Sequence, residues 1–258
     1  MTKKISTESD RHFDTIAADF VKKDLVPYCR IMRKLRLMQT LKHVDTPVGA
    51  VLEIGCGGGF AARYLRGQYR SYTGLDYARG LVAYAQHHNR DDRTLFLEKD
   101  VRRFDTADRY DVIFMIGVIH HLVDAKEILR HLRKFLKPDG VLIANEPHRG
   151  NPVIYLLRLL RTYIDPDYPK EQAFYLESEL RQLFIDSGYA IRSFPQGVLS
   201  TPLAETRFLP AAIGTPLARL LKFIDPLLDR LISVPVLRRL SWNVVVEGRI
   251  ADGKDAQS

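Results

Sequence analysis

The sequence predicts an α/β protein in which a doubly wound, mostly parallel sheet of seven strands carries helices on both faces. Three observations support this fold class. Short apolar runs of strand length alternate with segments of helical periodicity from residue 50 onward. The runs are apolar at successive positions, which is typical of strands buried on both faces of a parallel sheet. The first run ends in a glycine-rich turn, where α/β folds commonly bind a ligand.

Each element follows from its own pattern. The seven runs assigned to strands are VLEI (51–54), YTGLD (72–76), TLFLEKD (94–100), YDVIFMIG (110–117), GVLIANEP (140–147), AIRSFPQ (190–196) and WNVVVEGRI (242–250). Helices are expected at 58–67, 79–90 and 124–136, and at 177–189 with an end at Gly188. Apolar positions at helical spacing in 10–45, interrupted near Pro27, predict two N-terminal helices. We therefore divide the chain into an N-terminal helical cap, residues 1–46, and a main domain, residues 47–258.

The insertion at about 200–240, ahead of the last strand, has a basic amphipathic pattern. Its apolar residues recur at helical spacing, and basic residues outnumber Asp225 and Asp229. The basic residues are Arg219, Lys222, Arg230, Arg238 and Arg239. Two interpretations remain open: a helical lid that packs on the sheet and bends at Gly214 and nearby prolines, or a peripheral membrane contact. Either interpretation predicts an apolar or amphipathic, lipid-like substrate, since a leucine-rich lid would line an apolar pocket.

The composition limits the partners. A chain of 258 residues with 46% hydrophobic residues can bury one full core, and its net charge of +8 favours an anionic partner or simply solubility. Nucleic acid is a weaker candidate because the basic residues alternate with apolar stretches and lack interleaved stacking aromatics. Two cysteines are too few for a disulfide framework and suit a reducing, cytoplasmic compartment. With no signal-peptide pattern and no long apolar run, we expect a protein that is neither exported nor membrane-spanning.

The glycine turn after the first strand predicts the kind of ligand. Its sequence has the form E-x-G-x-G-x-G, from Glu53 to Gly59. A dinucleotide fingerprint beginning at Gly55 requires glycine or alanine at position 60, and this chain has Phe60. The acid that precedes the turn is poorly placed beside a pyrophosphate and well placed beside an ammonium or sulfonium group. The pattern therefore favours a cationic cofactor over a dinucleotide.

Two further strand ends carry acids. Asp76 follows Glu53 by 23 residues, where an acid accepts hydrogen bonds from ribose hydroxyls. Asp100 closes the third strand, where its carboxylate is expected to hold an adenine amino group while Val101 donates its backbone N–H. A single acid of this kind is most often a solvated strand end. Three acids in the same register indicate a binding site.

These motifs, in unbroken order over residues 47–148, resemble the class I S-adenosylmethionine-dependent methyltransferases, most closely the branch acting on small molecules, lipids and quinone precursors. The matching stretches are VLEIGCGGGF, GLDYA, EKDVRRF, YDVIFMIGVIHHLVD and LRKFLKPDGVLIANEP. The resemblance implies S-adenosyl-L-methionine as cofactor. It implies that Glu53, Gly55 and Gly57 face the methionine part, Asp76 the ribose, and Asp100 with Val101 the adenine. The full cofactor-binding set is Glu53, Gly55, Cys56, Gly57, Asp76, Tyr77, Asp100, Val101 and Gly117. RHFDTIAADF (11–20) is similar to the family's aromatic entry helix over the cofactor, whereas the insertion matches nothing assignable.

A histidine pair is the candidate catalytic feature. His120 and His121 follow the fourth strand, and Glu146, at the end of the next strand, is placed to orient one imidazole. The resemblance favours His121 as the base that deprotonates a hydroxyl. The competing interpretation is that one ring packs against a helix and the other only lines the pocket. A metal site from these three residues is disfavoured because adjacent histidines on a turn rarely converge on one ion.

The predicted function is methyl transfer from S-adenosylmethionine to a small apolar or amphipathic acceptor, as O-methylation with a histidine general base. Two alternatives are an RNA methyltransferase and a non-catalytic S-adenosylmethionine-binding module. Strongly salt-dependent RNA binding would favour the first alternative, whereas acids retained at all three strand ends argue against the second.

Overall fold

The seven predicted strands form one sheet. The computed structural model describes residues 21–156, 174–205, 209–234 and 237–251. The strands are β1 (Val48–Ile54), β2 (Tyr69–Asp76), β3 (Thr94–Glu98), β4 (Tyr110–Ile116), β5 (Leu136–Pro147), β6 (Tyr189–Gln196) and β7 (Asn243–Ile250), in the order β3-β2-β1-β4-β5-β7-β6. All neighbouring pairs are parallel except those of β7, which runs antiparallel to both β5 and β6. The predicted doubly wound, mostly parallel sheet is confirmed.

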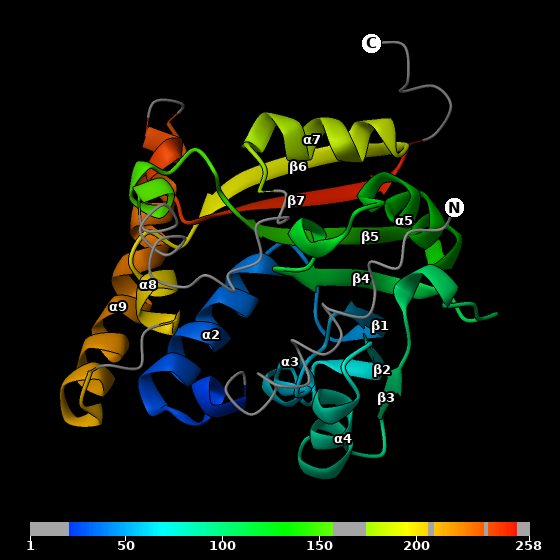
Figure 1. The fold of residues 1–258 in the computed structure, drawn as a ribbon, viewed down its shortest axis with the longest axis horizontal. Coiled ribbons are helices and arrows are strands. Elements are labelled where there is room, and N and C mark those ends of the chain that lie inside the picture. The colour runs from blue at the N-terminus through cyan, green and yellow to red at the C-terminus, as the bar shows by residue number, and fades with distance from the viewer. Residues whose placement is uncertain (1–20, 157–173, 206–208, 235–236, 252–258) are drawn as a thin grey trace.

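Helices cover both faces of this sheet (Figure 1). The α-helices whose bounds the structure describes are α2 (Pro27–Thr40), α3 (Phe60–Tyr64), α4 (Arg79–His88), α5 (Ala125–Leu132), α7 (Glu177–Asp186), α8 (Ser200–Glu205) and α9 (Ala211–Leu231). One buried cluster joins the sheet to α5 and α7. A second joins the opposite face to α2, α3 and α4. Because the two faces of the sheet have separate cores, the central strands are apolar at successive positions, as their sequences show.

The N-terminal helices agree with the sequence where they are described. Pro27 begins α2, in the position where a missing N–H costs nothing. The preceding turn at residues 21–25 is helical. Most of the first predicted helix, including the proposed entry helix at 11–20, lies outside the described residues.

The insertion before β7 packs mainly on the helix α2, and its role as a lid stays a prediction. Helices α8 and α9 stand beside α2 at the end of the sheet where β6 ends (Figure 1). A third hydrophobic cluster holds the three helices together; its buried members are Tyr28, Cys29, Met32, Leu35, Leu203, Ala204, Ala218 and Leu221. Part of the predicted cap (1–46) and the insertion (200–240) therefore share one core.

Gly214 has a packing role, which differs from the bend predicted there. α9 is continuous from Ala211 to Leu231. A Cβ at Gly214 would lie 2.4 Å from Cδ1 of the buried Tyr28 ring. Glycine therefore allows α9 to approach α2 closely.

None of the helices that the structure describes is long and apolar enough to cross a membrane.

Candidate active site

A cavity of about 490 Å³ lies beside the ends of β1 and β4. β1 and β4 are neighbouring central strands, and the order of strands along the chain reverses between them. Open α/β sheets bind ligands at such a switch point. The lining includes Glu53, Gly55, Cys56, Gly57, Gly117, His120 and His121. Seven of the twelve predicted site residues therefore meet in one cavity. The other five lie outside the lining formed by the described residues: Asp76, Tyr77, Asp100, Val101 and Glu146.

The glycine turn has a backbone that side chains rarely adopt. Gly55, Gly57 and Gly59 have φ angles of 72°, 50° and 74°, in the left-handed region that favours glycine. A Cβ at Gly55 would meet Val118 at 2.5 Å, whereas a Cβ at Gly57 would have no atom of the described residues within 4 Å. Space is therefore open beside Gly57, so a ligand can approach this backbone closely.

Phe60 explains why the dinucleotide pattern is broken. It is the first residue of α3, is buried, and packs with Val21, Ala78 and Leu81. Its ring stacks on Tyr84 with centroids 5.8 Å apart. The side chain therefore occupies the space that the third glycine of a dinucleotide fingerprint leaves for close helix–strand packing.

Asp76 holds the glycine turn through a hydrogen bond to its backbone. Its Oδ2 accepts a hydrogen bond from the backbone N–H of Gly57 at 2.8 Å, and its Oδ1 accepts one from Ala78 at 2.9 Å. The carboxylate thus positions the backbone beside the open space. Its role toward a ribose stays a prediction.

Glu53 is a buried acid on the cavity wall. It is 6% exposed, and its carboxylate accepts a hydrogen bond from the Tyr72 hydroxyl. Burial raises the pKa of Glu53 to about 8, against the opposing effect of that hydrogen bond and with a further contribution from the charges of Asp76 and Asp24. A cation beside this carboxyl would favour its ionised form, so the site suits the charge that the sequence predicts.

Asp100 and Val101 both have contacts within the protein. Asp100 caps the short 3-10 helix Val101–Arg103 by accepting the Arg102 N–H at 3.0 Å. Its Oδ2 also accepts from Nη2 of Arg102 at 2.6 Å. Val101 is buried within the core on the α5 side of the sheet. Contact with an adenine stays a prediction for both, because Asp100 is engaged by Arg102 in this structure.

Glu146 contacts His120, so the one imidazole that the sequence analysis expected it to orient is that of His120. The role of His121 as the base stays a prediction. Nδ1 of His120 lies 2.7 Å from Oε2 of Glu146, and both side chains are buried. Glu146 also accepts backbone N–H bonds from Val118 at 2.9 Å and Ile119 at 2.7 Å. His121 is exposed, with its ring centroid 4.0 Å from that of His120. Because Glu146 occupies Nδ1, Nε2 is the ring nitrogen of His120 that is left for a ligand.

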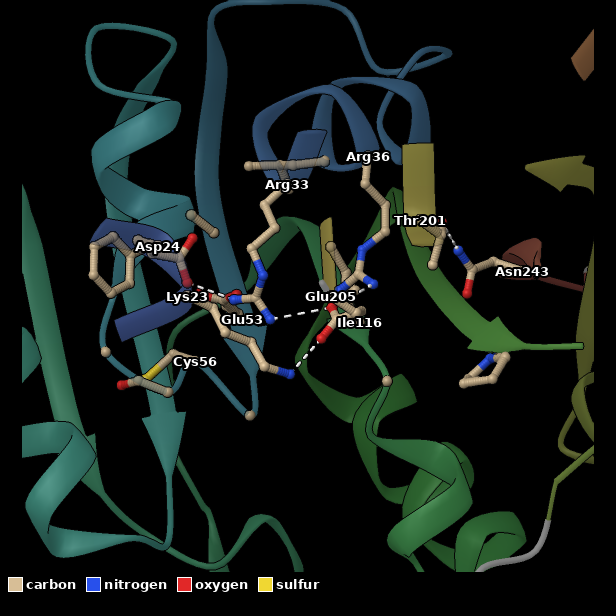
Figure 2. Close-up of a pocket in the computed structure, with 18 of the residues that line it drawn as sticks. Lys23, Asp24, Arg33, Arg36, Glu53, Cys56, Ile116, Thr201, Glu205 and Asn243 are labelled. Carbon is tan, nitrogen blue, oxygen red and sulfur yellow. Dashed lines mark hydrogen bonds and ion pairs between the residues drawn. The ribbon is translucent and has the colours of Figure 1, made fainter. Parts of the chain in front are cut away.

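The structure also brings charged residues that the sequence analysis missed to the cavity. Figure 2 shows Arg33 and Arg36 projecting from α2 toward Glu205 of α8, which Lys23 approaches from the opposite side. Oε1 of Glu205 lies 3.3 Å from Nη2 of Arg33 and 3.7 Å from Nη1 of Arg36, and its Oε2 lies 2.5 Å from Nζ of Lys23. Asp24 pairs with Arg33 and accepts a hydrogen bond from the Tyr64 hydroxyl at 2.8 Å.

These contacts leave Glu205 ionised. Partial desolvation opposes its ionisation, but Arg33, Lys23 and Arg36 outweigh it and hold the pKa of Glu205 well below its usual range. The spacing of Arg33 and Arg36 on one helical face was a signal in the sequence. Their partner was not, since Glu205 comes from a segment more than 160 residues later. Within the described parts of the chain, no group of three or more His, Cys, Asp or Glu residues is arranged to hold a metal ion.

The strand order with a reversed seventh strand and the glycine turn after β1 are those of the class I S-adenosylmethionine-dependent methyltransferase fold, and the predicted resemblance is confirmed. Residues 52–142 match the family model described as "Methyltransferase domain". Together with the fold, this match confirms S-adenosylmethionine as the predicted cofactor.

Curated relatives match part of the chain. A ubiquinone biosynthesis O-methyltransferase of Rickettsia akari is 25% identical over 158 residues, which cover 59% of this chain and 62% of the relative. A malonyl-[acyl-carrier protein] O-methyltransferase of Bacillus anthracis is 30% identical over 122 residues, which cover 45% of each chain. The chain thus spans less than two thirds of the length of either relative.

Solved structures share the fold over nearly the whole chain. A chain in the complex of the Haloferax volcanii Trm112 methyltransferase activator with a methyltransferase has a TM-score of 0.64 at 17% identity, covering 93% of this chain and 96% of that one. The magnesium protoporphyrin IX methyltransferase of Synechocystis PCC 6803 has a TM-score of 0.61 at 14% identity, covering 95% and 99%. At these identities the likeness establishes the fold.

Proposed function

We propose that this protein transfers a methyl group from S-adenosylmethionine to an oxygen atom of a small amphipathic acceptor, with His120 as the general base. The observation that carries the proposal is that His120, buried and paired with Glu146, lines the same cavity as the glycine turn. The relatives in Rickettsia akari and Bacillus anthracis, whose names specify O-methylation, support the oxygen assignment.

The cavity fits the cofactor by two features of its own. Gly57 leaves open space beside a left-handed backbone, and Glu53 presents a buried acid with a raised pKa. In the proposed complex, Gly57 admits the methionine part and Glu53 pairs with its ammonium group. The bound cofactor supplies a methyl group that its sulfonium already activates, so the protein contributes alignment and a base.

His120 is the better base on geometric grounds. A general base needs a defined tautomer, and Glu146 fixes one by accepting the proton on Nδ1. Nε2 then accepts the hydroxyl proton of the acceptor, and the resulting imidazolium is stabilised by the Glu146 carboxylate. His121, which lines the cavity from an exposed position, is proposed to contact the acceptor.

The acceptor class follows from the cavity wall. Its apolar members include Leu37, Phe60 and Ile116, and its cations include Arg33 and Arg36. This mixture supports an amphipathic acceptor. Of the described residues of the insertion, those that line the cavity are Thr201 and Glu205, so its described leucines lie outside the lining. We further propose a cytoplasmic protein, which its two free cysteines support.

Two measurements test this function. Titration calorimetry is expected to show S-adenosylmethionine binding in preference to NAD. Incubation with labelled cofactor and a panel of phenols, catechols and carboxylic acids is expected to yield an O-methylated product and S-adenosylhomocysteine. Preferential NAD binding would refute the proposal, and N-methylated products alone would refute its oxygen assignment. Strongly salt-dependent RNA binding with RNA methylation would support the alternative acceptor class instead.

A further inference from the structure

The insertion presents an apolar face to solvent. Six residues of α9 are between 39% and 71% exposed: Ile213, Leu217, Leu220, Phe223, Leu227 and Leu231. At 3.6 residues per turn they lie within an arc of about 120°. An amphipathic helix normally turns a stripe of this width toward a core. We name these six residues the outer face of α9.

The opposite side of α9 already faces a core. Gly214, Ala218 and Leu221 are buried, with the latter two in the cluster shared with α2 and α8. The helix is therefore held in place by its inner side. Its outer face is additional apolar surface, so packing among the residues that the structure describes does not explain it.

The acidic residues of α9 lie on its inner side, and its basic residues are exposed to solvent. The acids Asp225 and Asp229 are 2% and 7% exposed, and they accept backbone N–H bonds from Leu199 at 2.7 Å and Gly197 at 2.8 Å. The basic residues Arg219, Lys222 and Arg230 are exposed. The solvent side of the helix thus carries apolar and basic residues without the acids that balance them in the sequence.

The apolar surface continues beyond the end of α9. Leu237 and Leu240, in the 3-10 helix Leu237–Leu240, are 42% and 45% exposed. Nδ2 of Asn151 donates to the carbonyl oxygen of Leu240 at 3.0 Å, which brings the helical turn at 152–156 to the same end of the molecule. That turn exposes three more apolar side chains: Val153, Tyr155 and Leu156.

We propose that the outer face of α9 binds the surface of an anionic lipid bilayer, with α9 lying in the plane of the interface. A helix of 21 residues is about 30 Å long, and apolar residues bordered by arginine and lysine are the pattern of interfacial helices. Charge complementarity favours anionic lipid over a second copy of the chain, because two copies would bring like-charged Arg219 and Arg230 side chains together.

Membrane binding would place the cavity near the bilayer. Helix α8 contacts α9 and supplies Thr201 and Glu205 to the cavity wall. An amphipathic acceptor held in the bilayer would then need to move only a short way to reach the site. The surface contact itself does not depend on the proposed reaction.

Vesicle sedimentation of the full chain tests the proposal without any enzymatic readout. We expect binding to vesicles of equal parts phosphatidylcholine and phosphatidylglycerol at low salt, and much weaker binding to phosphatidylcholine alone or at high salt. The double variant Leu220→Glu with Phe223→Glu is expected to abolish this binding. The double variant Arg219→Gln with Arg230→Gln is expected to weaken it about thirty-fold.

Matched controls separate surface chemistry from folding. Ile185→Glu places the same acid at a 46% exposed apolar position on α7 and is expected to leave vesicle binding unchanged. All variants are expected to bind S-adenosylmethionine like the wild type. Absence of vesicle binding, or equal binding to neutral and anionic vesicles, would overturn the proposal. A dimer in sedimentation equilibrium that Leu220→Glu disrupts, without vesicle binding, would assign this face to a second copy of the chain.

Discussion

Nδ1 of His120 and Oε2 of Glu146 lie 2.7 Å apart, and the pair joins the ends of β4 and β5. Glu146 is 1% exposed, and it also accepts backbone N–H bonds from the turn that carries the histidine. One buried carboxylate therefore positions both the imidazole and its backbone. Such a pair resembles the arrangement in which a carboxylate orients a catalytic histidine.

The first prediction distinguishes the two histidines. His120→Ala is expected to lower the methyl-transfer rate by about 10²–10⁴-fold, because a general base typically contributes that factor. His121→Ala is expected to cost less than His120→Ala. The measurement is single-turnover kinetics, with cofactor affinity determined separately by calorimetry. A larger loss of rate from His121→Ala than from His120→Ala would show that the exposed His121 is the general base.

The second prediction concerns Glu146 as a positioning residue. Glu146→Gln retains one acceptor oxygen but weakens stabilisation of the imidazolium, so the rate is expected to fall while the cofactor affinity stays unchanged. A rate that stays at the wild-type value in Glu146→Gln would show that Glu146 only maintains the turn.

The third prediction concerns Asp76. Asp76→Ala removes the acceptor of two backbone N–H bonds, so both the melting temperature and the S-adenosylmethionine affinity are expected to fall. Loss of a hydrogen bond to a charged group costs about 1.5–3 kcal/mol. Asp92→Ala, at an exposed acid in the loop before β3, serves as the control. A wild-type affinity of Asp76→Ala for S-adenosylmethionine would show that Asp76 does not contribute to the cofactor site.

The fourth prediction follows from the pKa of Glu53, which burial raises to about 8. At neutral pH this carboxyl is mainly protonated, and a cationic cofactor favours its ionised form. Binding of S-adenosylmethionine at pH 7 is therefore expected to release part of a proton. Calorimetry in buffers of different ionisation enthalpy measures this release. Glu53→Gln should remove it, and proton release that persists in this variant would point to another group.

Glu53 also predicts how stability depends on pH. The folded protein keeps this proton to about pH 8, whereas the unfolded chain loses it near the ordinary value of 4.5. The unfolded state thus binds fewer protons between these pH values, so Glu53 makes the free energy of unfolding decrease as pH rises through this window. Denaturant titrations at several pH values should show a shallower decrease in Glu53→Gln.

The fifth prediction tests the contact between α9 and α2. Alanine is normally better than glycine inside a helix by roughly 0.5–1 kcal/mol. Gly214→Ala is nevertheless expected to destabilise the protein by about 1–3 kcal/mol, because its Cβ would meet the Tyr28 ring. Ala212→Gly, at an exposed position in the same helix, should lower stability only by the helix-propensity difference. A stabilising Gly214→Ala would show that the two helices separate easily.

The sequence by itself determined the sheet and the cofactor turn, because both depend on local patterns. Strands buried on two faces need apolar residues at successive positions, and central runs such as VLEI and YDVIFMIG carry them. The left-handed backbone at Gly55, Gly57 and Gly59 needs glycine. These requirements act within a few residues, so they can be recognised without knowledge of the rest of the chain.

Only the tertiary structure decided which groups meet across long distances in the sequence. Both histidines follow β4, yet the partner on β5 reaches Nδ1 of His120 and leaves His121 exposed. Arg33 meets Glu205 across 172 residues. The leucines of α9 predicted a pocket lining, but small residues at Gly214 and Ala218 let the other side of the helix pack on α2. Helical periodicity identifies an apolar stripe, whereas close packing between helices decides which side is buried.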